Sequence, residues 1–132
     1  MSGRHRPLSR SAVVGVADRV LRSERSRALL SITFVGPDRI RMLNQRWRGK
    51  PLVTDVLAFP LSSPRGLAGD IYICRWQGAR QAAVHGVSLR EELIRLIVHG
   101  ILHVLGRVHP EGPARLASSM WQRQERLVRA LR

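Results

Sequence analysis

Two histidines interrupt the longest strongly apolar stretch of the chain, and their spacing restricts what that stretch can become. Residues 93–105, LIRLIVHGILHVL, are typical of a helix buried in a core. On a helix, His99 and His103 are one turn apart and share a face, so both imidazoles can reach one ion. A buried imidazole without a partner costs about 1–3 kcal/mol, and a shared metal ion removes that cost. The stretch therefore predicts a core helix that carries two metal ligands.

A third histidine follows the point where this helix can end. Gly106 can adopt a left-handed conformation and reverse the chain after Leu105, which brings His109 back toward the same ion. Three neutral imidazoles suit zinc and leave the fourth tetrahedral position open to water, as in catalytic zinc sites. We therefore predict one zinc ion bound by His99, His103 and His109.

The spacing H-x-x-x-H-x-x-G-x-x-H is also that of metzincin peptidases, whose second motif residue is a glutamate that acts as general base. In this chain that position is Gly100. General-base assistance contributes roughly 10²–10⁴-fold to a reaction rate, so a peptidase without it would be severely impaired. The motif therefore favours metal chemistry other than ordinary proteolysis.

The charge balance indicates a polyanionic partner. The chain has 23 Lys and Arg residues against 9 Asp and Glu, a formal net charge of +14. Each phosphate that these cations neutralise releases condensed counterions, which favours binding to nucleic acid. Residues 1–50 hold 12 cations and 3 anions, whereas residues 51–112 hold 6 and 5. If the partner is RNA, the two ends of the chain bind most of it and the middle carries the chemistry.

Length and cysteine content indicate one domain in a reducing compartment. We expect a single domain over residues 1–132, with a basic N-terminal arm over residues 1–10 that can be flexible. Cys74 is the only cysteine, so no internal disulfide can form, and it is expected to pack in the core. The apolar stretch is shorter than the ~20 residues that span a bilayer, and AVVGVA at 12–17 is too short for a signal sequence. We therefore expect a cytoplasmic protein without a membrane partner.

Periodicity and chain-breaking residues predict a mixture of helices and strands. Helices are expected over residues 11–22, 38–47, 76–85, around 93–105, and over 113–129. Strands are expected over residues 29–35, 55–59 and 70–74, the last two separated by the turn-rich LSSPRGLAG. In the second helix, Ile40, Leu43 and Trp47 are expected to face inward, and Ser88 and Glu91 form a capping box for the histidine helix. Strands and helices that do not alternate strictly indicate an α+β fold.

Three further motifs precede the histidines, namely LNQRWR at 43–48, TDVLAFP at 54–60 and GDIYIC at 69–74. Within them, Asp55 and Asp70 are expected to satisfy local backbone donors rather than to bind a metal. In this order, and followed by HGILHVLGRVH, the motifs resemble the YbeY family of bacterial rRNA-maturation endoribonucleases. The resemblance covers about residues 29–125.

This resemblance implies a fold, an activity and a set of site residues. The fold is a small zincin-like α+β domain, with about four strands in a mixed sheet, about five helices, and one helix that carries the metal ligands. The zinc histidines fall on His99, His103 and His109, and the functionally important arginine of the family falls on Arg48. The implied activity is that of a zinc-dependent, single-strand-specific endoribonuclease of the cytoplasm, which acts in 16S rRNA 3′-end maturation and ribosome quality control.

The chain departs from the family pattern at several positions. Val108 stands where the family has an aspartate beside the third ligand, so a carboxylate that could orient an imidazole is absent there. Ala58 replaces the usual serine of TDVLSFP, and Val53 replaces the usual proline. The connection from Arg48 to Thr54 is also short.

Two other functions fit the same residues. One is a non-catalytic ribosome-assembly factor, in which zinc is structural and the basic surface binds rRNA or a ribosomal protein. The other is a metal-dependent hydrolase of another class, such as a peptidase whose base comes from elsewhere in the fold. A peptidase would work in high salt, whereas an RNA enzyme with this charge would weaken steeply. His5 and His85 have no motif partners and are assigned no chemistry.

The aromatic residues are few. The chain has three Trp, two Phe and one Tyr, and we expect most of them in the core. Because single-stranded RNA is read largely by stacking on aromatic side chains, we derive no RNA sequence preference from this sequence, and we expect RNA shape or partner proteins to provide specificity.

Overall fold

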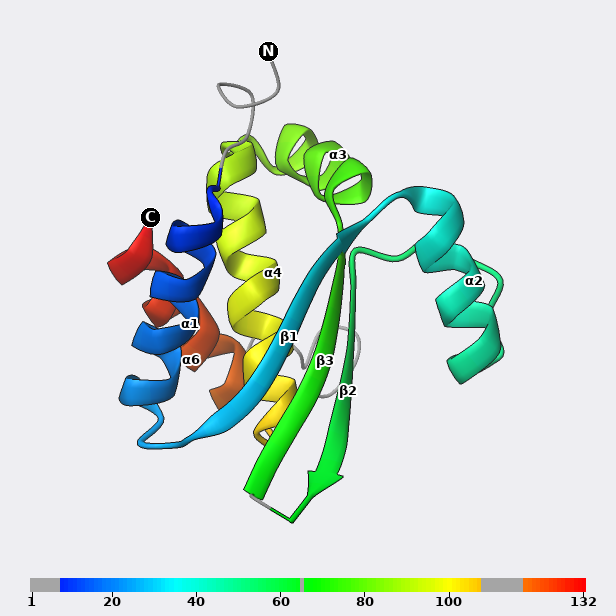
Figure 1. Ribbon diagram of the computed structural model, residues 1–132. Helices are drawn as coiled ribbons and strands as arrows, with labels where there is room; N and C mark the ends of the chain where they lie inside the picture. Colours follow the sequence, from blue (N-terminus) through cyan, green and yellow to red (C-terminus); the bar gives the residue numbers. More distant parts are fainter. Residues whose placement is uncertain (1–7, 65, 108–117) are drawn as a thin grey trace.

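A mixed β-sheet lies between helices on its two faces (Figure 1). The structure is a computed structural model that describes residues 8–64, 66–107 and 118–132. Strand β1 (Ala28–Val35) pairs in parallel with β3 (Gly66–Cys74), and β3 pairs in antiparallel with β2 (Val56–Ser63). The strand order is therefore β1-β3-β2, which places β2 at one edge.

The strand number differs from the expectation of about four. The described residues form a three-stranded sheet, which matches the three strand segments that the sequence pattern predicts. The fourth strand was implied by the family resemblance alone and had no segment of this sequence behind it. The zincin-like description of the fold stays a prediction.

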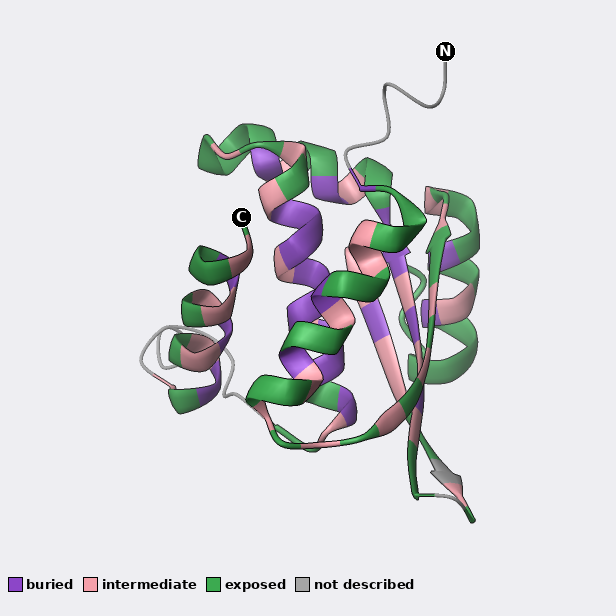
Figure 2. Cartoon of the chain, turned by 60° about the vertical axis from the view of Figure 1, so that its left-hand side comes forward, coloured by how far each residue is buried: buried purple, intermediate pink, exposed green. Residues whose placement is uncertain are grey.

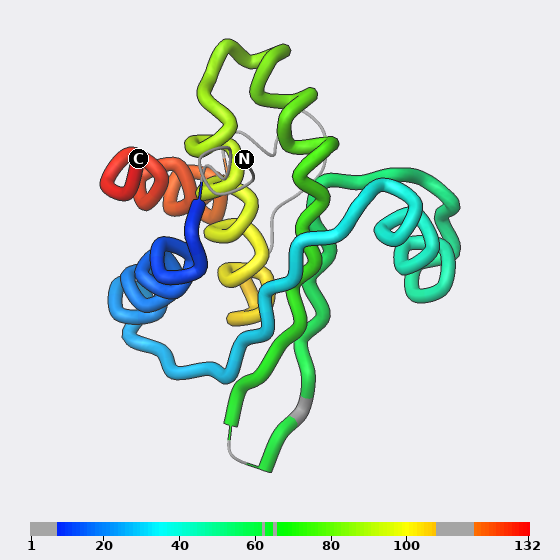
Figure 3. Tube along the Cα trace, turned by 45° about the horizontal axis from the view of Figure 1, so that its top comes forward, coloured from blue at the N-terminus to red at the C-terminus, as the bar shows by residue number. Residues whose placement is uncertain are grey.

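Five helices are described, which together with the mixed sheet confirms a small α+β fold. They are α1 (Arg10–Ser23), α2 (Pro37–Arg48), α3 (Arg75–His85), α4 (Leu89–Val104) and α6 (Ser119–Leu131). Helix α4 packs on one face of the sheet between α1 and α6, and α2 lies on the opposite side (Figures 1 and 3). None of the helices in the described ranges is long and apolar enough to cross a membrane.

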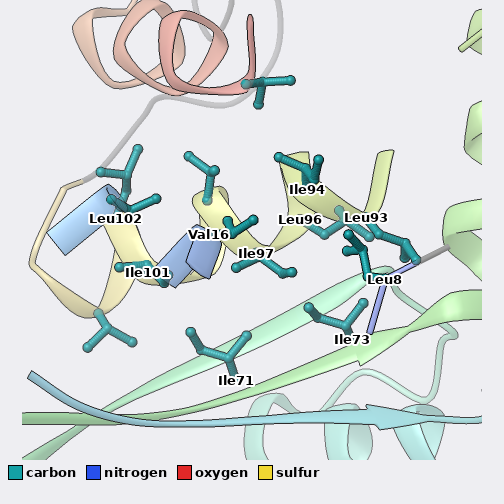
Figure 4. Packing of buried hydrophobic residues seen from close by; sticks show 14 of the residues in the cluster. Leu8, Val16, Ile71, Ile73, Leu93, Ile94, Leu96, Ile97, Ile101 and Leu102 are labelled. Atoms are coloured by element: carbon teal, nitrogen blue, oxygen red, sulfur yellow. The ribbon is translucent and has the colours of Figure 1, made fainter. Parts of the chain in front are cut away.

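The main core lies between α4 and the sheet. Helix α4 is buried along most of its length (Figure 2). Ile71 and Ile73 point from β3 toward Ile97 and Ile101 of α4, and all four side chains are fully buried (Figure 4). Burying one such side chain contributes about 1.5–3 kcal/mol, so this layer is a major source of the stability of the fold.

A second, smaller cluster lies on the other face of the sheet. Ile40 of α2 packs there with Leu57 and Cys74, and the burial of Cys74 confirms its predicted place in a core. The inward orientation expected for Trp47 is wrong, because 61% of its surface is exposed. Asn44 is buried one turn earlier on α2, and the small cluster is too limited to cover an indole ring at the end of the helix.

Helix ends follow local hydrogen bonds. The Ser88 hydroxyl accepts from the Glu91 amide (3.0 Å) and caps α4, whereas the Glu91 carboxylate binds Arg95 instead of completing the capping box. At the other end of α4, Gly106 adopts the expected left-handed conformation (φ 89°). The Arg107 amide donates to the Leu102 carbonyl (2.9 Å), which closes a Schellman turn.

Two predicted boundaries are corrected. The last helix begins at Ser119, because Ser118 is extended and its hydroxyl accepts from the Trp121 amide. The earlier residues 113–117 of that prediction lie outside the described ranges. The turn-rich segment between the strands is mostly strand, since the β2–β3 ladder continues to the pair Ser63 and Gly66.

The packed part of the chain begins before residue 10, the predicted end of the N-terminal arm. Leu8 is buried against the main core, and α1 starts at Arg10. The expectation of a flexible arm therefore concerns only residues 1–7, which the structure does not describe.

Candidate metal and phosphate site

A cavity of about 210 Å³ lies where β2 meets two helices on opposite faces of the sheet. Its walls come from the end of α2, the first half of β2 and the last turns of α4. The lining residues are Arg48, Val56, Leu57, Ala58, Phe59, His99 and His103. Three of the four predicted site residues, distant in sequence, are therefore brought to one cavity.

Arg48 is positioned by the end of α2. Gly49 follows it in a left-handed conformation (φ 70°), and its amide donates to the Gln45 carbonyl (3.0 Å). The buried Asn44 donates through Nδ2 to the Leu52 carbonyl (2.9 Å), which ties the short connection back onto the helix. The arginine is exposed and lines the cavity, so its guanidinium can reach a charged ligand there.

His99 is oriented by a glutamine of another helix. Its Nδ1 lies 2.9 Å from Oε1 of Gln124, whose side chain is 1% exposed. The Gln124 amide nitrogen donates to Glu125 (3.1 Å), so the amide oxygen faces the ring and Nδ1–H is the donor. A neutral imidazole with its proton on Nδ1 presents a lone pair at Nε2, which is the form that binds a metal ion.

His103 lies one turn further along α4 and is exposed. Two imidazoles one helical turn apart in one cavity, with one ring fixed by a buried acceptor, fit a zinc ion. The third predicted ligand, His109, lies outside the described residues. Within the ranges that are described, no group of three side chains capable of binding a metal forms.

Behind Gln124, a charged cluster joins α4 to α6. Arg95 donates to Glu125 through two nitrogens (both 2.9 Å), and also to Glu92 and Glu91. Burial alone would raise the pKa of Glu125, but hydrogen bonds from Arg95 and Gln124 outweigh it and lower that pKa. The hydrogen bond from Arg95 likewise lowers the pKa of Glu91. These carboxylates therefore stay ionised and hold Arg95 in place.

The two aspartates of the upstream motifs do not line the cavity. Asp55 accepts from the Val56 amide (2.7 Å) and from Gln81 of α3 (3.0 Å), which agrees with the structural part expected for it. Asp70 lies within β3, and His85 is the last residue of α3. His5 lies outside the described residues.

Position 100 has no room for the glutamate of metzincins. A Cβ atom built on Gly100 would lie 2.8 Å from Cγ2 of Ile71 on β3, where the helix rests directly on the sheet. Because real Cβ atoms do not approach other carbons this closely, even alanine would force a shift. The absence of a general base at this position is therefore built into the packing of α4.

Sequence reasoning missed Gln124, although a signal for it was present. Met120, Gln124 and Val128 recur at intervals of four residues and form the buried stripe of α6. A polar residue inside an apolar stripe needs a hydrogen-bond partner, and here that partner is His99. The sequence alone gave no indication of which partner it would be.

A family model described as Endoribonuclease YbeY matches residues 7–132. The chain belongs to the YbeY family. It is 46% identical over 109 residues to the Endoribonuclease YbeY of Anaeromyxobacter sp. (strain Fw109-5), covering 80% of this chain and 56% of that relative. To the Endoribonuclease YbeY of Persephonella marina it is 38% identical over 108 residues, covering 78% of this chain and 70% of that relative.

A solved structure is also similar in fold. The solution structure of TM1509 from Thermotoga maritima matches with a TM-score of 0.65 at 27% identity, over 92% of this chain and 79% of that one. The chain spans about half the length of several curated relatives that it matches, for example 56% in Anaeromyxobacter and 49% in Bifidobacterium animalis. Membership of the family and the arrangement of the fold are thus established together.

Proposed function

We propose that this protein is a zinc-dependent, single-strand-specific endoribonuclease that matures the 3′ end of 16S rRNA in the cytoplasm and takes part in ribosome quality control. The observation that carries the proposal is the meeting of Arg48, His99 and His103 at one cavity, in a chain of the YbeY family. The substrate class is ribosomal RNA, alone or in ribosomal particles.

The histidines would hold the metal. His99 and His103, joined by His109, offer the imidazole nitrogens that zinc prefers. When bound, zinc supplies Lewis-acid activation of water near neutral pH, which makes a protein base unnecessary. Gln124 keeps the proton of His99 on Nδ1 and so keeps Nε2 directed to the site. The missing general base at Gly100 is consistent with this chemistry.

Arg48 would hold the phosphate. Its guanidinium lines the same cavity as the two histidines, and a planar guanidinium donates two parallel hydrogen bonds to phosphate oxygens. A positive charge fixed there stabilises the negative charge that grows on the phosphate as the P–O bond breaks. Arg48 therefore binds the substrate and lowers the barrier.

The net charge of +14 supports RNA as the substrate. Electrostatic attraction to phosphates is sequence-independent and falls steeply with salt, because bound counterions are released. We expect the affinity for RNA to decrease strongly between low and moderate salt, whereas a peptidase acting on uncharged peptides would show little change.

Cleavage of end-labelled precursor 16S rRNA tests the proposal. Zinc-loaded wild type is compared with Arg48→Ala and His103→Ala, with zinc content and circular dichroism recorded for each. Arg48→Ala should keep its zinc and lose roughly 10²–10³-fold in cleavage rate. His103→Ala should lose zinc and cleavage together. Arg39→Ala is the matched control, because Arg39 is exposed on the same helix and does not line the cavity.

Three other outcomes have distinct meanings. Equal cleavage by all preparations would identify a contaminating nuclease. Tight rRNA binding by wild type without cleavage would favour a non-catalytic, zinc-containing assembly factor that binds rRNA or a ribosomal protein. Hydrolysis of uncharged peptides in high salt, with RNA left intact, would favour a peptidase.

A further inference from the structure

None of the six aromatic side chains is buried, contrary to the expectation that most belong to the core. Phe34, Trp47 and Trp76 are exposed by 40%, 61% and 49%, and the other three are partly exposed. Aromatic rings contribute large apolar areas, and most folds of this size use them inside. No aromatic side chain is among the buried residues of the described core, and three of the rings, Phe34, Trp47 and Trp76, are exposed at the surface.

Trp47 is an exposed ring that does not itself line the cavity but is next to two residues that do. It immediately precedes Arg48, which lines the cavity. Its ring centroid lies 6.0 Å from that of Phe59, which lines the cavity from β2. Phe59 supports one side of the indole, and more than half of the Trp47 surface stays open to solvent. An aromatic surface therefore extends from the cavity out along the end of α2.

The surroundings of this ring are cationic. The guanidinium carbon of Arg46 lies 5.5 Å from the centroid of the Trp47 ring. Residues 37–50 contain five cations and a single carboxylate, Asp38, which binds Arg41 at the far end of the helix (3.1 Å). An exposed aromatic ring beside arginines is the combination with which proteins bind single-stranded nucleic acid, one base per ring.

We propose that Trp47 forms a nucleobase subsite, on which one base of single-stranded RNA stacks while a neighbouring phosphate of the same strand reaches Arg48. This subsite rests on the proposed ribonuclease function and specifies how the substrate is held. A base can stack on Trp47 only when it is unpaired and turned outward, so the subsite also gives a physical reason for preferring single strands.

Trp76 provides an internal comparison. It is exposed by 49%, and the guanidinium carbon of Arg80 lies 4.8 Å from its ring centroid, so its local chemistry matches that of Trp47. It stands at the start of α3 and does not line the cavity. If exposure and a stacked arginine were sufficient for RNA binding, both tryptophans would contribute equally.

The test is the binding of a fluorescein-labelled single-stranded oligoribonucleotide, followed by anisotropy at one fixed salt concentration. Wild type, Trp47→Ala, Trp47→Phe and Trp76→Ala are compared, with circular dichroism and thermal unfolding as checks of folding. Trp47→Ala should weaken binding by about 5- to 150-fold, the range for loss of one stacked base. Trp47→Phe should retain most of the affinity, and Trp76→Ala should match wild type. An RNA duplex should bind all four proteins alike.

The experiment can refute the Trp47 subsite without refuting the proposed ribonuclease function. If wild type binds and cleaves RNA while Trp47→Ala binds as well as wild type, the subsite is refuted and the nuclease stands. An equal loss in Trp47→Ala and Trp76→Ala also refutes it, because position beside the cavity would then be irrelevant. If wild type binds no RNA, both the subsite and the proposed function are refuted.

Discussion

A single buried glutamine determines how His99 presents its ring. Gln124 belongs to α6, its oxygen accepts from Nδ1 of His99, and its nitrogen is held by Glu125. Because neither end of the amide can turn without breaking a hydrogen bond, the imidazole keeps one tautomer. Such partners of metal ligands typically contribute 10- to 100-fold to metal affinity.

Replacement of Gln124 by leucine should therefore weaken zinc binding by about 10- to 100-fold. The side chains are similar in size, so the buried volume is preserved while the acceptor for Nδ1–H is lost. Competition with a chromophoric chelator gives the zinc affinity directly. Gln122→Leu is the control, because Gln122 is exposed on the same helix. Equal zinc affinities in the two variants would contradict the orienting part assigned to Gln124.

For single residues, the histidine spacing and the family motifs predicted the side chains that meet at the cavity, but not the side chains that orient them. His99 and His103 share a helix face by geometry, and Arg48 came from the family resemblance. Gln124 was missed because its partner lies 25 residues away in sequence, on another helix. Trp47 was placed inward because helical periodicity says nothing about how much core lies beneath the last turn of a helix.

At the level of elements, α4 is seated on β3 by two close contacts. Gly100 lies against Ile71, and Gly69 of β3 lies against Val104, where a Cβ atom would come within 2.5 Å of a methyl carbon. Gly100 lies between His99 and His103, and Val104 directly follows His103, so both contacts lie on the histidine-bearing turns of α4. The two glycines, which lack side chains, therefore allow α4 to lie close to the sheet. The position of the cavity walls, which come partly from α4, depends on this short distance.

Substitution of Gly100 by alanine should destabilise the fold by about 1–3 kcal/mol, because Ile71 is fully buried and must move to admit a methyl group. Gly15→Ala is the matched control in another helix. No atom outside its own helix lies within 4 Å of a Cβ at that position, so it should gain up to about 1 kcal/mol from helix propensity. Urea denaturation measures both. Equal effects would show that position 100 is not crowded.

The ends of helices and strands were predictable where hydrogen bonds of neighbouring residues determine them. Gly106 and Ser88 terminate α4 through backbone and hydroxyl hydrogen bonds that any such residues could make. The length of the β2–β3 hairpin was not predictable, because pairing across the ladder outweighs the turn preference of LSSPRGLAG. The start of α6 depends on Ser118, one of two adjacent serines in the segment that could cap the helix.

For the whole molecule, four of the nine carboxylates belong to ion-pair clusters that join helices. Arg95 joins Glu91 and Glu92 of α4 to Glu125 of α6, and Glu24 of α1 binds Arg107 and Arg123. The Glu24 side chain is only 3% exposed, so its charge faces protein rather than solvent. The four arginines in these ion pairs, Arg95, Arg107, Arg123 and Arg132, balance the four carboxylates, so the net charge of +14 belongs to the rest of the chain and stays available to attract a polyanion.

Low pH should weaken the ion pairs between Arg95 and its carboxylate partners Glu91 and Glu125. The pKa values of Glu91 and Glu125 are lowered in the folded protein, so their contribution to stability is complete above the ordinary carboxyl range and is lost as the pH falls through the lowered values. Arg95→Met should therefore be less stable than wild type at about pH 7, and the gap should narrow at about pH 3. Thermal unfolding of both proteins between about pH 3 and about pH 7 measures this difference in stability. A gap that does not change with pH would contradict the coupling.

The helices on the two faces of the sheet are packed against hydrophobic clusters of very different size. The histidines belong to α4 and the main core, whereas Arg48 belongs to α2, which rests on the small cluster of Ile40, Leu57 and Cys74. Regions with fewer buried contacts open at lower free energy. On warming, the part of the site that carries Arg48, proposed to bind phosphate, would therefore separate first while the histidines proposed to bind zinc stay in place. Under the proposed function, the protein would lose RNA before zinc, and inactivation would precede unfolding.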